Sequence, residues 1–488
     1  MTKAAASPVL SLPRADPDLH GLDAAAVQAF VRAADAQQLK LHSLMIVRHG
    51  HVLAEGWWQP YAADIPHTVF SVSKSFTASA IGLAEAESLL STSEPVLDFF
   101  PRLARDRLQS GASSLTLEHL LTMATGHAED TMAIMRALPG RDWVEVFFEV
   151  PLVYPAGTHF LYNSGASFVL SAALQARAGV TLDEYVRSRL LEPLGIRAPA
   201  WAASPHGISL GASGLRLRTE DLAKFGLLYL QGGWFGGSQV LPEDWVARAT
   251  ALHVATRSEA ADWAQGYGYQ FWRSTHDSYR ADGAYGQFSL VLPEQDAVIA
   301  ITAGNRDNWR IPPVVWEHLL PGFHPDTGAG GRENGLGRDL RSLAIPAPGF
   351  RPDPPAREAA LTGQTVTVEP NVLGIRAIRM EAEPGAMVMT LTFADGSTES
   401  TPAGRAEWLP GSTALWPYDE PADPRIASCA GWTDETTLEV HQQCIGTAFR
   451  RVWQFRFGDG DDVSISVGLD MAYWHDRTEV ISGLMQPG

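Results

Sequence analysis

The sequence predicts an α/β domain followed by a smaller antiparallel β domain, and three observations support that fold class. Strand-like apolar segments occur before and after a long helical region that fills roughly residues 73 to 250. A stretch rich in glycine and proline follows this first domain. Beyond it, residues 359–488 alternate between apolar and polar positions, as half-buried strands do. The strands predicted for the first domain are 43–48, 52–56, 267–272, 288–292 and 297–302.

The predicted elements follow in chain order from the N-terminus. A helix is predicted over residues 23–34, with Asp23 as its N-cap. The α/β domain is expected to span residues 1–320, and a Gly/Pro-rich linker residues 321–358. Residues 359–488 are expected to form a barrel or a sandwich, in which Asp-Gly pairs mark turns. The clearest strands of that domain are 365–368, 387–393 and 463–467.

Bulk properties are those of a soluble enzyme. The chain has 488 residues, 45% of them apolar, which is enough to bury two cores. Its net charge of −18 repels nucleic acid and anionic membranes, so neither is expected as a partner. No apolar run approaches the length of a membrane span, and the first residues lack the apolar core of a signal peptide. A cytoplasmic location is therefore expected, with Cys429 and Cys444 as free thiols.

Metal and nucleotide sites are not indicated by the sequence. The 15 histidines are scattered, and neither a His-Glu-x-x-His motif nor a Cys-x-x-Cys motif occurs. No glycine-rich loop combines with Lys-Ser or Lys-Thr in the pattern that cradles phosphates. We therefore expect no metal and no cofactor.

Lysine usage singles out one residue. Only four of the 37 basic residues are lysines, and Lys74 stands three places after Ser71. A lysine ammonium can lose its proton when it is desolvated and then act as a base, whereas a guanidinium stays charged. Because residues 77–84 are small and largely apolar, a buried helix is predicted to begin here, with both side chains on one face of its first turn. Hydroxyl and amine can then touch, and the Ser71 N–H lies where the helix N-terminus favours negative charge.

Three separated motifs resemble those of the penicillin-recognising serine hydrolases, in which Ser-x-x-Lys opens a helix. They are Phe70-Ser-Val-Ser-Lys-Ser-Phe-Thr77, Leu120-Leu-Thr-Met-Ala-Thr-Gly126 and Glu192-Pro-Leu-Gly-Ile196. The likeness is to the class C β-lactamase-like branch of esterases, D-aminopeptidases and 6-aminohexanoate-dimer hydrolases, and it covers roughly residues 20 to 320. It implies a β-lactamase/transpeptidase-like antiparallel sheet with helices on both sides, plus an all-helical region.

The resemblance implies a second catalytic element within residues 155–165. Tyr162 would place its phenol beside the serine and the lysine, and Asn163 and Ser164 are candidates for substrate binding. Ser164 stands where the family's Tyr-Ala-Asn form has its asparagine. The alternative interpretation is a tyrosine packed in the core beside an Asn-Ser-Gly turn.

The third element of the family is Lys-Thr-Gly or His-Thr-Gly, and it falls here on Ala281-Asp282-Gly283. Gly283 fits and is a candidate substrate contact, since the absence of a side chain lets a substrate approach the backbone. The Ala284 N–H would then act as an oxyanion donor together with the N–H of Ser71.

The family's cation is absent from this element, because Ala281 takes its place. That lysine or histidine helps to hold the carboxylate of penicillin-type substrates, so its loss argues against β-lactamase activity. Asp282 is a candidate to pair with an amino-bearing substrate, and a solvated turn aspartate is the alternative.

The Glu-x-x-Leu-Asn signature of class A general bases is absent between these elements. The resemblance therefore implies a Ser-Lys-Tyr mechanism. Ser71 would attack the carbonyl of a small-molecule ester or amide and form an acyl-enzyme, with its proton passing to the pair of Lys74 and Tyr162. The two titrations are expected to be coupled, so the sequence leaves open which residue carries the proton at rest.

Two alternatives to a general esterase or amidase remain open. One is a D-amino-acid-specific peptidase or amidase that binds a free amino group near Asp282. The other is a non-catalytic acyl-binding sensor that is acylated at Ser71 without turnover. The C-terminal domain is expected to shape access to the site, to add stability or to mediate a homodimer. Candidate pocket aromatics, for which core packing is an equal explanation, are Trp57, Trp58, Tyr267 and Trp272.

Overall fold

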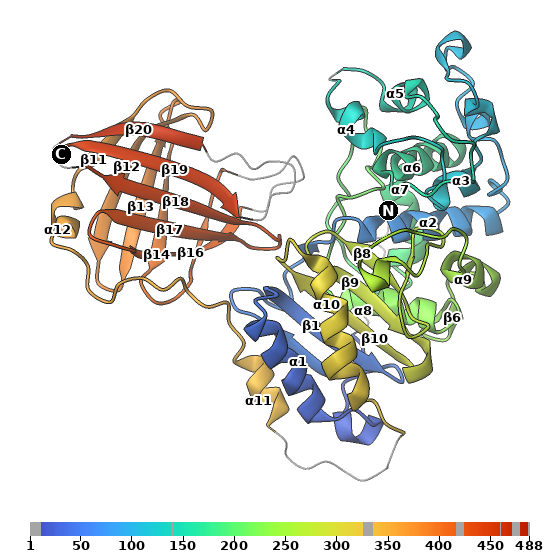
Figure 1. The fold of residues 1–488 in the computed structure, drawn as a ribbon, viewed down its shortest axis with the longest axis horizontal. Helices are drawn as coiled ribbons and strands as arrows, with labels where there is room; N and C mark the ends of the chain where they lie inside the picture. The colour runs from blue at the N-terminus through green and yellow to red at the C-terminus, as the bar shows by residue number, and fades with distance from the viewer. Residues whose placement is uncertain are drawn as a thin grey trace, which may run out of the picture. The chain divides into compact units, whose positions relative to one another are not determined.

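The structure is a computed structural model of the 488-residue chain. It describes residues 11–138, 140–325, 335–415, 424–458, 460–470 and 479–486. The chain divides into two compact units, which Figure 1 shows as ribbons. The first comprises Met1–Gly56, Pro66–Ala303 and Asp307–Ser342, and the second comprises Trp57–Ile65, Gly304–Arg306 and Leu343–Gly488. The chain therefore passes to the second unit after Ser342, inside the segment predicted as a linker.

A six-stranded sheet in the order β2-β1-β10-β9-β8-β7 forms the centre of the first unit. β10 pairs antiparallel with both β1 and β9, so the two ends of this unit's chain meet in one sheet. Every residue of β1, β8, β9 and β10 is buried, as expected for a sheet that is covered on both faces. The strands are β1 (Leu41–Arg48), β2 (His51–Trp57), β7 (Trp272–Arg273), β8 (Tyr279–Gly283), β9 (Gln287–Leu292) and β10 (Ala297–Ala303). Two short pairs join β3 (His67–Thr68) to β4 (Arg216–Leu217) and β5 (Trp234–Phe235) to β6 (Ser238–Gln239).

Helices from distant parts of the sequence cover this sheet. α1 (Ala24–Ala36) begins where predicted, because the Asp23 side chain accepts a hydrogen bond from the Ala25 N–H. α1 packs near α10 (Ile311–Val314), and α8 (Thr219–Leu230) packs on β1, β9 and β10 (Figure 1). The remaining helices are α2 (Val72–Ala86), α3 (Leu117–Leu121), α4 (Thr131–Arg136), α5 (Trp143–Glu149), α6 (Ser164–Ala178), α7 (Leu182–Val186), α9 (Glu243–Thr250), α11 (Leu336–Arg341) and α12 (Arg357–Leu361).

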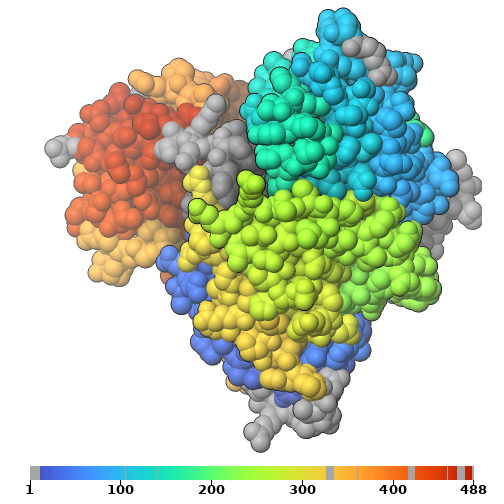
Figure 2. Space-filling model, turned by 45° about the vertical axis from the view of Figure 1, so that its right-hand side comes forward, coloured from blue at the N-terminus to red at the C-terminus, as the bar shows by residue number. Residues whose placement is uncertain are grey.

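The helical region is centred on α2 and α6, which contact each other and are both rich in small residues. Residues 72–84 of α2 are all buried. Their small size permits close approach: a Cβ on Gly82 would lie 2.2 Å from the ring of Trp245. In Figure 2, the blue and teal helical segments and the lime-green and yellow segments of the same unit form one continuous surface. α2 therefore holds its first turn in a densely packed and desolvated position.

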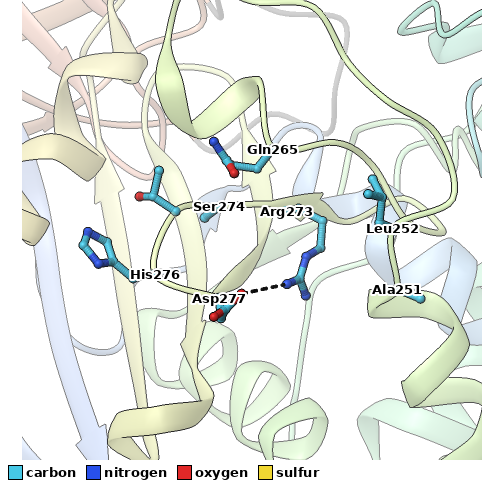
Figure 3. Close-up of a pocket in the computed structure, with 8 residues that line it drawn as sticks. Ala251, Leu252, Gln265, Arg273, Ser274, His276 and Asp277 are labelled. Carbon is cyan, nitrogen blue, oxygen red and sulfur yellow. Dashed lines mark ion pairs between the residues drawn. The ribbon is translucent and has the colours of Figure 1, made fainter.

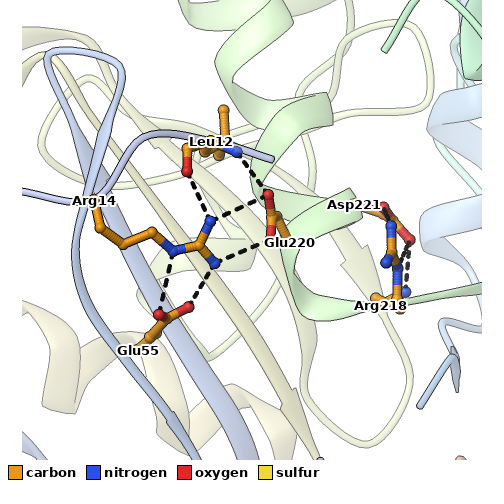
Figure 4. A network of polar contacts seen from close by, with 6 residues as sticks. All are labelled: Leu12, Arg14, Glu55, Arg218, Glu220 and Asp221. Atoms are coloured by element: carbon orange, nitrogen blue, oxygen red, sulfur yellow. Dashed lines mark hydrogen bonds and ion pairs between the residues drawn. The ribbon is translucent and has the colours of Figure 1, made fainter. Parts of the chain in front are cut away.

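An arginine ties the N-terminal segment to the rest of the first unit (Figure 4). The Arg14 guanidinium donates to Glu55 at 2.8 Å and to Glu220 at 3.0 Å, which joins the segment to β2 and α8. Glu220 also accepts the Leu12 N–H at 2.7 Å. A separate pair, Arg218–Asp221, closes the first turn of α8.

The second unit contains a ten-stranded sheet that closes on itself. Its order is β14-β13-β12-β11-β20-β19-β18-β17-β16-β15, and a parallel bridge between Gly404 and Cys429 joins β14 to β16. Closure leaves a barrel-like sheet, one of the two forms predicted. Large apolar side chains such as Trp432, Trp453 and Phe455 form its core. The strands are β11 (Thr365–Val368), β12 (Ile375–Glu383), β13 (Ala386–Phe393), β14 (Thr398–Gly404), β15 (Leu409–Ser412), β16 (Arg425–Trp432), β17 (Thr437–Cys444), β18 (Arg450–Phe457), β19 (Asp462–Asp470) and β20 (Glu479–Gln486).

Two features of the described chain bear on the predictions from composition. Cys429 and Cys444 are free and buried, and burial raises the pKa of both thiols. Among the helices of the described residues, none combines the length and the apolar character that crossing a membrane requires.

Candidate active site

Ser71 is the N-cap of α2, and its hydroxyl contacts the lysine one turn later. Its backbone angles are helical (φ −69°, ψ −8°), and its side chain makes no capping hydrogen bond. The Lys74 Nζ donates to the Ser71 Oγ at 3.0 Å. The Ser71 hydroxyl is thus paired with an amine instead of satisfying its own helix.

Lys74 is buried among neutral oxygen atoms. Its side chain is 1% exposed, and besides Ser71 its Nζ donates to the Ala212 carbonyl at 2.9 Å and to the Ser164 Oγ at 3.4 Å. Burial lowers the pKa of Lys74 from 10.5 to about 8, attraction by Asp130 opposes this shift, and repulsion by Arg136 adds to it. A neutral amine is therefore accessible at mildly alkaline pH.

Tyr162 completes a group of three side chains around the Ser71 hydroxyl. Its ring centroid lies 4.9 Å from the Lys74 Nζ, and its phenol is close enough to the Ser71 side chain for Ser71 to act on its pKa. Burial raises the pKa of Tyr162, and the nearby Ser71 side chain opposes only part of the shift. Tyr162 is consequently a neutral phenol across the ordinary pH range, and a proton donor rather than a resting base.

Asn163 is turned into the fold. Its Oδ1 accepts hydrogen bonds from the Gly165 N–H at 3.0 Å, the Thr131 N–H at 3.1 Å and the Thr131 Oγ1 at 2.9 Å, and the residue is fully buried. The same oxygen caps α6. The assignment of Asn163 to substrate binding does not fit this geometry, and we assign it instead to holding the loop that carries Tyr162.

Ser164 reaches the site, and an aspartate that the sequence reasoning missed supports it. The Ser164 Oγ accepts from Lys74, and its N–H donates to Asp130 Oδ1 at 2.9 Å. Asp130 also caps α4, since the same oxygen accepts the Met132 N–H at 3.0 Å. The sequence signals an N-cap at this position, but the second contact spans 34 residues of chain and has no local signature.

The third predicted element lies at the end of β8, close to the start of α2. A Cβ on Gly283 would lie 2.3 Å from the carbonyl oxygen of Val69, so only glycine permits this approach. Just beyond, the rings of Phe70 and Tyr285 pack with centroids 5.0 Å apart, although both residues have positive φ (47° and 67°). These contacts clamp together the two segments that carry the proposed oxyanion donors.

The two N–H groups predicted to be oxyanion donors belong to the residues inside this clamp. Ser71 follows Phe70, and Ala284 precedes Tyr285 in the turn between β8 and β9. Neither N–H donates to a backbone carbonyl among the described turns, loops and caps. Both groups are therefore available for a ligand oxygen.

Asp282 differs from both sequence interpretations, because it is buried and already paired. Its Oδ2 accepts from the Arg280 Nε at 2.9 Å, its Oδ1 accepts weakly from Asn308 at 3.4 Å, and it is 8% exposed. Burial raises the pKa of Asp282 to about 6, with the attraction of Arg280 opposing the shift. The expectation of a solvated turn aspartate is wrong. The Arg280 guanidinium pairs with the Asp282 carboxylate, because side chains two residues apart in a strand share one face of the sheet. Ala281, between them, contributes no cation.

Aromatic side chains surround Tyr162. Trp272 of β7 stacks on its ring at 5.7 Å, and Tyr267 and Phe160 meet Trp272 edge-on at 4.9 and 5.6 Å. Arg280 lies over Trp263 at 4.1 Å, beside the same cluster. Two of the four predicted pocket aromatics, Tyr267 and Trp272, thus lie at the site. The other two, Trp57 and Trp58, belong to the second unit.

A pocket of about 450 Å³ lies next to β7, and it is separate from the Ser71 site (Figure 3). Arg273 follows Trp272 in the strand and therefore points away from the aromatic cluster, toward Asp277 at 4.0 Å. The lining is mostly polar and comprises Ala251, Leu252, Gln265, Arg273, Ser274, Thr275, His276 and Asp277. Neither a nucleophile paired with a base nor any predicted site residue is among them.

Comparison with known proteins agrees with this geometry. The sequence profile of the family described as Beta-lactamase matches residues 27–310, which is more than half of the chain. The chain belongs to the beta-lactamase family. The resemblance inferred from the Ser-x-x-Lys, Leu-Leu-Thr-Met and Glu-Pro-Leu-Gly motifs is thereby confirmed, as is the β-lactamase-like α/β fold. All of the candidate site residues named in this subsection lie inside the matched region.

Three proteins similar to this chain are distant from it in sequence. A 6-aminohexanoate-dimer hydrolase of Paenarthrobacter ureafaciens is 24% identical over 280 residues, which cover 53% of this chain and 71% of that protein. The octameric penicillin-binding protein homologue of Pyrococcus abyssi has a TM-score of 0.50 at 16% identity, covering 93% of this chain and 99% of the other. EstCE1, a hydrolase with promiscuous acyltransferase activity, has a TM-score of 0.51 at 16% identity over 60% of this chain and 97% of its own. At these identities the structural likenesses establish the fold alone.

Proposed function

We propose that the protein is a serine hydrolase of carboxylic esters or amides that works through an acyl-enzyme on Ser71. One observation carries the proposal: the Ser71 hydroxyl is hydrogen-bonded to a buried lysine of lowered pKa, and the neutral phenol of Tyr162 lies beside this pair. A nucleophile in contact with a base and close to a proton donor is the arrangement that acyl transfer requires. The activities for which two similar proteins are named, a dimer hydrolase and a hydrolase with acyltransferase activity, support the same reaction class.

In the proposed acylation, the neutral Lys74 amine takes the Ser71 proton as Oγ attacks the substrate carbonyl. The oxygen of the tetrahedral intermediate accepts hydrogen bonds from the N–H groups of Ser71 and Ala284. The carbon–leaving-group bond then breaks, Tyr162 gives its proton to the leaving group, and the Lys74 ammonium returns a proton to the tyrosinate. The products are a neutral leaving group and an ester on Ser71. Both catalytic residues end in their starting states.

Deacylation reverses these roles with water as the nucleophile. Lys74 takes a proton from the water molecule that attacks the ester, and the same two N–H groups hold the oxyanion. Collapse of the intermediate releases the carboxylic acid and restores the Ser71 hydroxyl, whose proton comes back from Tyr162 and Lys74. The structure supplies no other base in contact with Ser71 among the described residues.

The substrate is proposed to lack a carboxylate of the penicillin type. Ala281 replaces the cation of the family's third element and is fully buried. The neighbouring cation, Arg280, is 0% exposed and paired with Asp282. The D-amino-acid-specific alternative loses support for the same reason, since Asp282 has no free charge to offer an amino group. β-Lactam hydrolysis is consequently expected to be weak.

The test is intact-mass analysis during reaction with a p-nitrophenyl acyl ester, together with steady-state release of p-nitrophenol. Turnover that disappears in the Ser71→Ala variant, with a transient acyl adduct in the wild type, would support the hydrolase. Ser73→Ala is the matched control in the same helical turn, because the Ser73 hydroxyl accepts the Leu215 N–H instead of facing Lys74. A lasting adduct without turnover would favour the acyl-binding sensor. Absence of any Ser71-dependent reaction, including with a fluorophosphonate, would remove Ser71 as nucleophile.

A further inference from the structure

Asp130 occupies a position between two helix ends and the catalytic lysine. One of its oxygens, Oδ1, accepts the Met132 N–H of α4 at 3.0 Å and the Ser164 N–H of α6 at 2.9 Å. Its other oxygen, Oδ2, makes no hydrogen bond or ion pair with any residue that the structure describes. Asp130 is thus joined to Lys74 through one residue, Ser164, whose N–H meets the carboxylate and whose hydroxyl meets the ammonium.

Among the described residues, the Lys74 ammonium has no negatively charged hydrogen-bond acceptor, so a carboxylate nearby would stabilise it. All three of its recorded acceptors, Ser71, Ser164 and the Ala212 carbonyl, are uncharged. No carboxylate in the described parts of the chain lies within ion-pair distance of its Nζ. A buried ammonium without any counter-charge strongly prefers to lose its proton. Among the charges acting on Lys74, Asp130 is the one that opposes this loss.

We propose that Asp130 is a positioning residue that supplies the counter-charge for Lys74 at one remove, through Ser164, and so sets the pH at which the site becomes active. A carboxylate in direct contact would hold the lysine proton and block its use as a base. Placed beyond Ser164, the carboxylate offsets only part of the burial. The same contact fixes Ser164 and the first turn of α6, so charge and geometry are adjusted together. This inference rests on the proposed function of Lys74.

Other charged groups face this assembly from neighbouring elements. Arg136, at the exposed end of α4, acts on Lys74 with the opposite sign to Asp130. Asp282 of β8 acts on Tyr162 and is paired with Arg280, so its charge is largely balanced. The Asp130 variant and the Arg136 variant therefore form a pair with opposite expected shifts.

The experiment follows Lys74 directly by NMR in protein labelled with [ε-¹³C]lysine, because the whole chain contains only four lysines. Lys→Arg variants assign the signals. In Asp130→Asn, whose amide oxygen can still cap α4, the Lys74 titration is expected to move down by roughly half a pH unit or more. Arg136→Gln is expected to move it up by a smaller amount. The acid limb of the kcat/KM profile should shift in the same direction as the NMR titration in each variant.

The matched control is Asp142→Asn, since Asp142 caps α5 in the same way through the Val144 N–H at 2.8 Å. This variant should leave the Lys74 titration unchanged. If Asp130→Asn lowers kcat/KM equally at every pH and leaves the lysine titration in place, Asp130 is merely structural and the proposal is wrong. Asp130→Ser, which also keeps a capping oxygen, replaces Asp130→Asn if that variant fails to fold. NMR detects the Lys74 titration without any substrate. The role proposed for Asp130 can therefore fail while Ser71-dependent turnover is observed, and it can hold even if no Ser71-dependent turnover is found.

Discussion

The pH dependence of the wild-type enzyme is the sharpest prediction of the Lys74 environment. If the neutral amine of Lys74 is the base, the rate follows the fraction of molecules in which it is unprotonated. With the pKa of Lys74 lowered to about 8, that fraction is about one in ten at pH 7 and about nine in ten at pH 9. An unburied lysine at 10.5 would offer only about one molecule in 3,000 at pH 7. Burial therefore raises the active fraction at neutral pH by roughly 300-fold.

The assay measures kcat/KM for a p-nitrophenyl ester from pH 6 to 9.5, read at the isosbestic wavelength of p-nitrophenol. We expect a rise of about tenfold per pH unit below pH 8, followed by a plateau. Ser71→Ala protein, measured in parallel, corrects for spontaneous hydrolysis at high pH. A flat profile would refute the assignment of Lys74 as a titrating base. A single inflection near pH 6 would refute it too, and would point to Asp282, whose pKa is raised to about 6.

Three further predictions follow from contacts near the site and from the second unit. Gly283→Ala places a Cβ 2.3 Å from the Val69 carbonyl oxygen, so kcat should fall by about 100-fold, whereas Gly349→Ala, which meets nothing within 4 Å, should be neutral. Arg280→Met leaves Asp282 buried and unpaired and should lower the free energy of unfolding by about 3 kcal/mol in urea titrations, with partial recovery in the double variant that adds Asp282→Asn. The two buried cysteines should resist a thiol reagent in the native protein and react only in denaturant, and fast reaction without denaturant would contradict their burial.

Local patterns predicted much of the fold. The Asp23 cap, the hairpin of β1 and β2, and the strands β9 and β10 lie where the sequence places them, because each depends on periodicity or capping within a few residues. A strand was predicted over residues 267–272. This prediction is wrong for most of its length, since β7 spans only Trp272–Arg273. Gln270 there has a positive φ of 59°. Its side chain bonds to the Ser167 hydroxyl and to the carbonyls of Leu120 and Leu121 instead of following a strand.

The candidate site divides in the same way. Ser71 and Lys74 lie one helical turn apart, so their contact follows from spacing alone. Tyr162 lies 91 residues after Ser71 in the sequence, and only the family resemblance predicted that it belongs to the site. Asp130, Asn163 and the pairing of Arg280 with Asp282 depend on which side of a loop or strand faces inward. No periodicity reports that orientation, which is why Asn163 and Asp282 were assigned to the substrate and Asp130 was missed.

The same packing that lowers the pKa of Lys74 also makes its protonated form costly for the folded state. A decrease in pKa from 10.5 to about 8 corresponds to about 3 kcal/mol of unfavourable free energy for the protonated folded state. Between these two values the unfolded chain binds more protons than the folded one, so stability rises with pH in this window, and below pH 8 the full cost applies. A direct ion pair would remove that cost, but it would also hold the proton on Lys74 and so prevent the amine from acting as a base. The placement of Asp130 beyond Ser164 is consistent with both demands, because it stabilises the ammonium in part while leaving Nζ bonded to the neutral oxygen that must lose its proton.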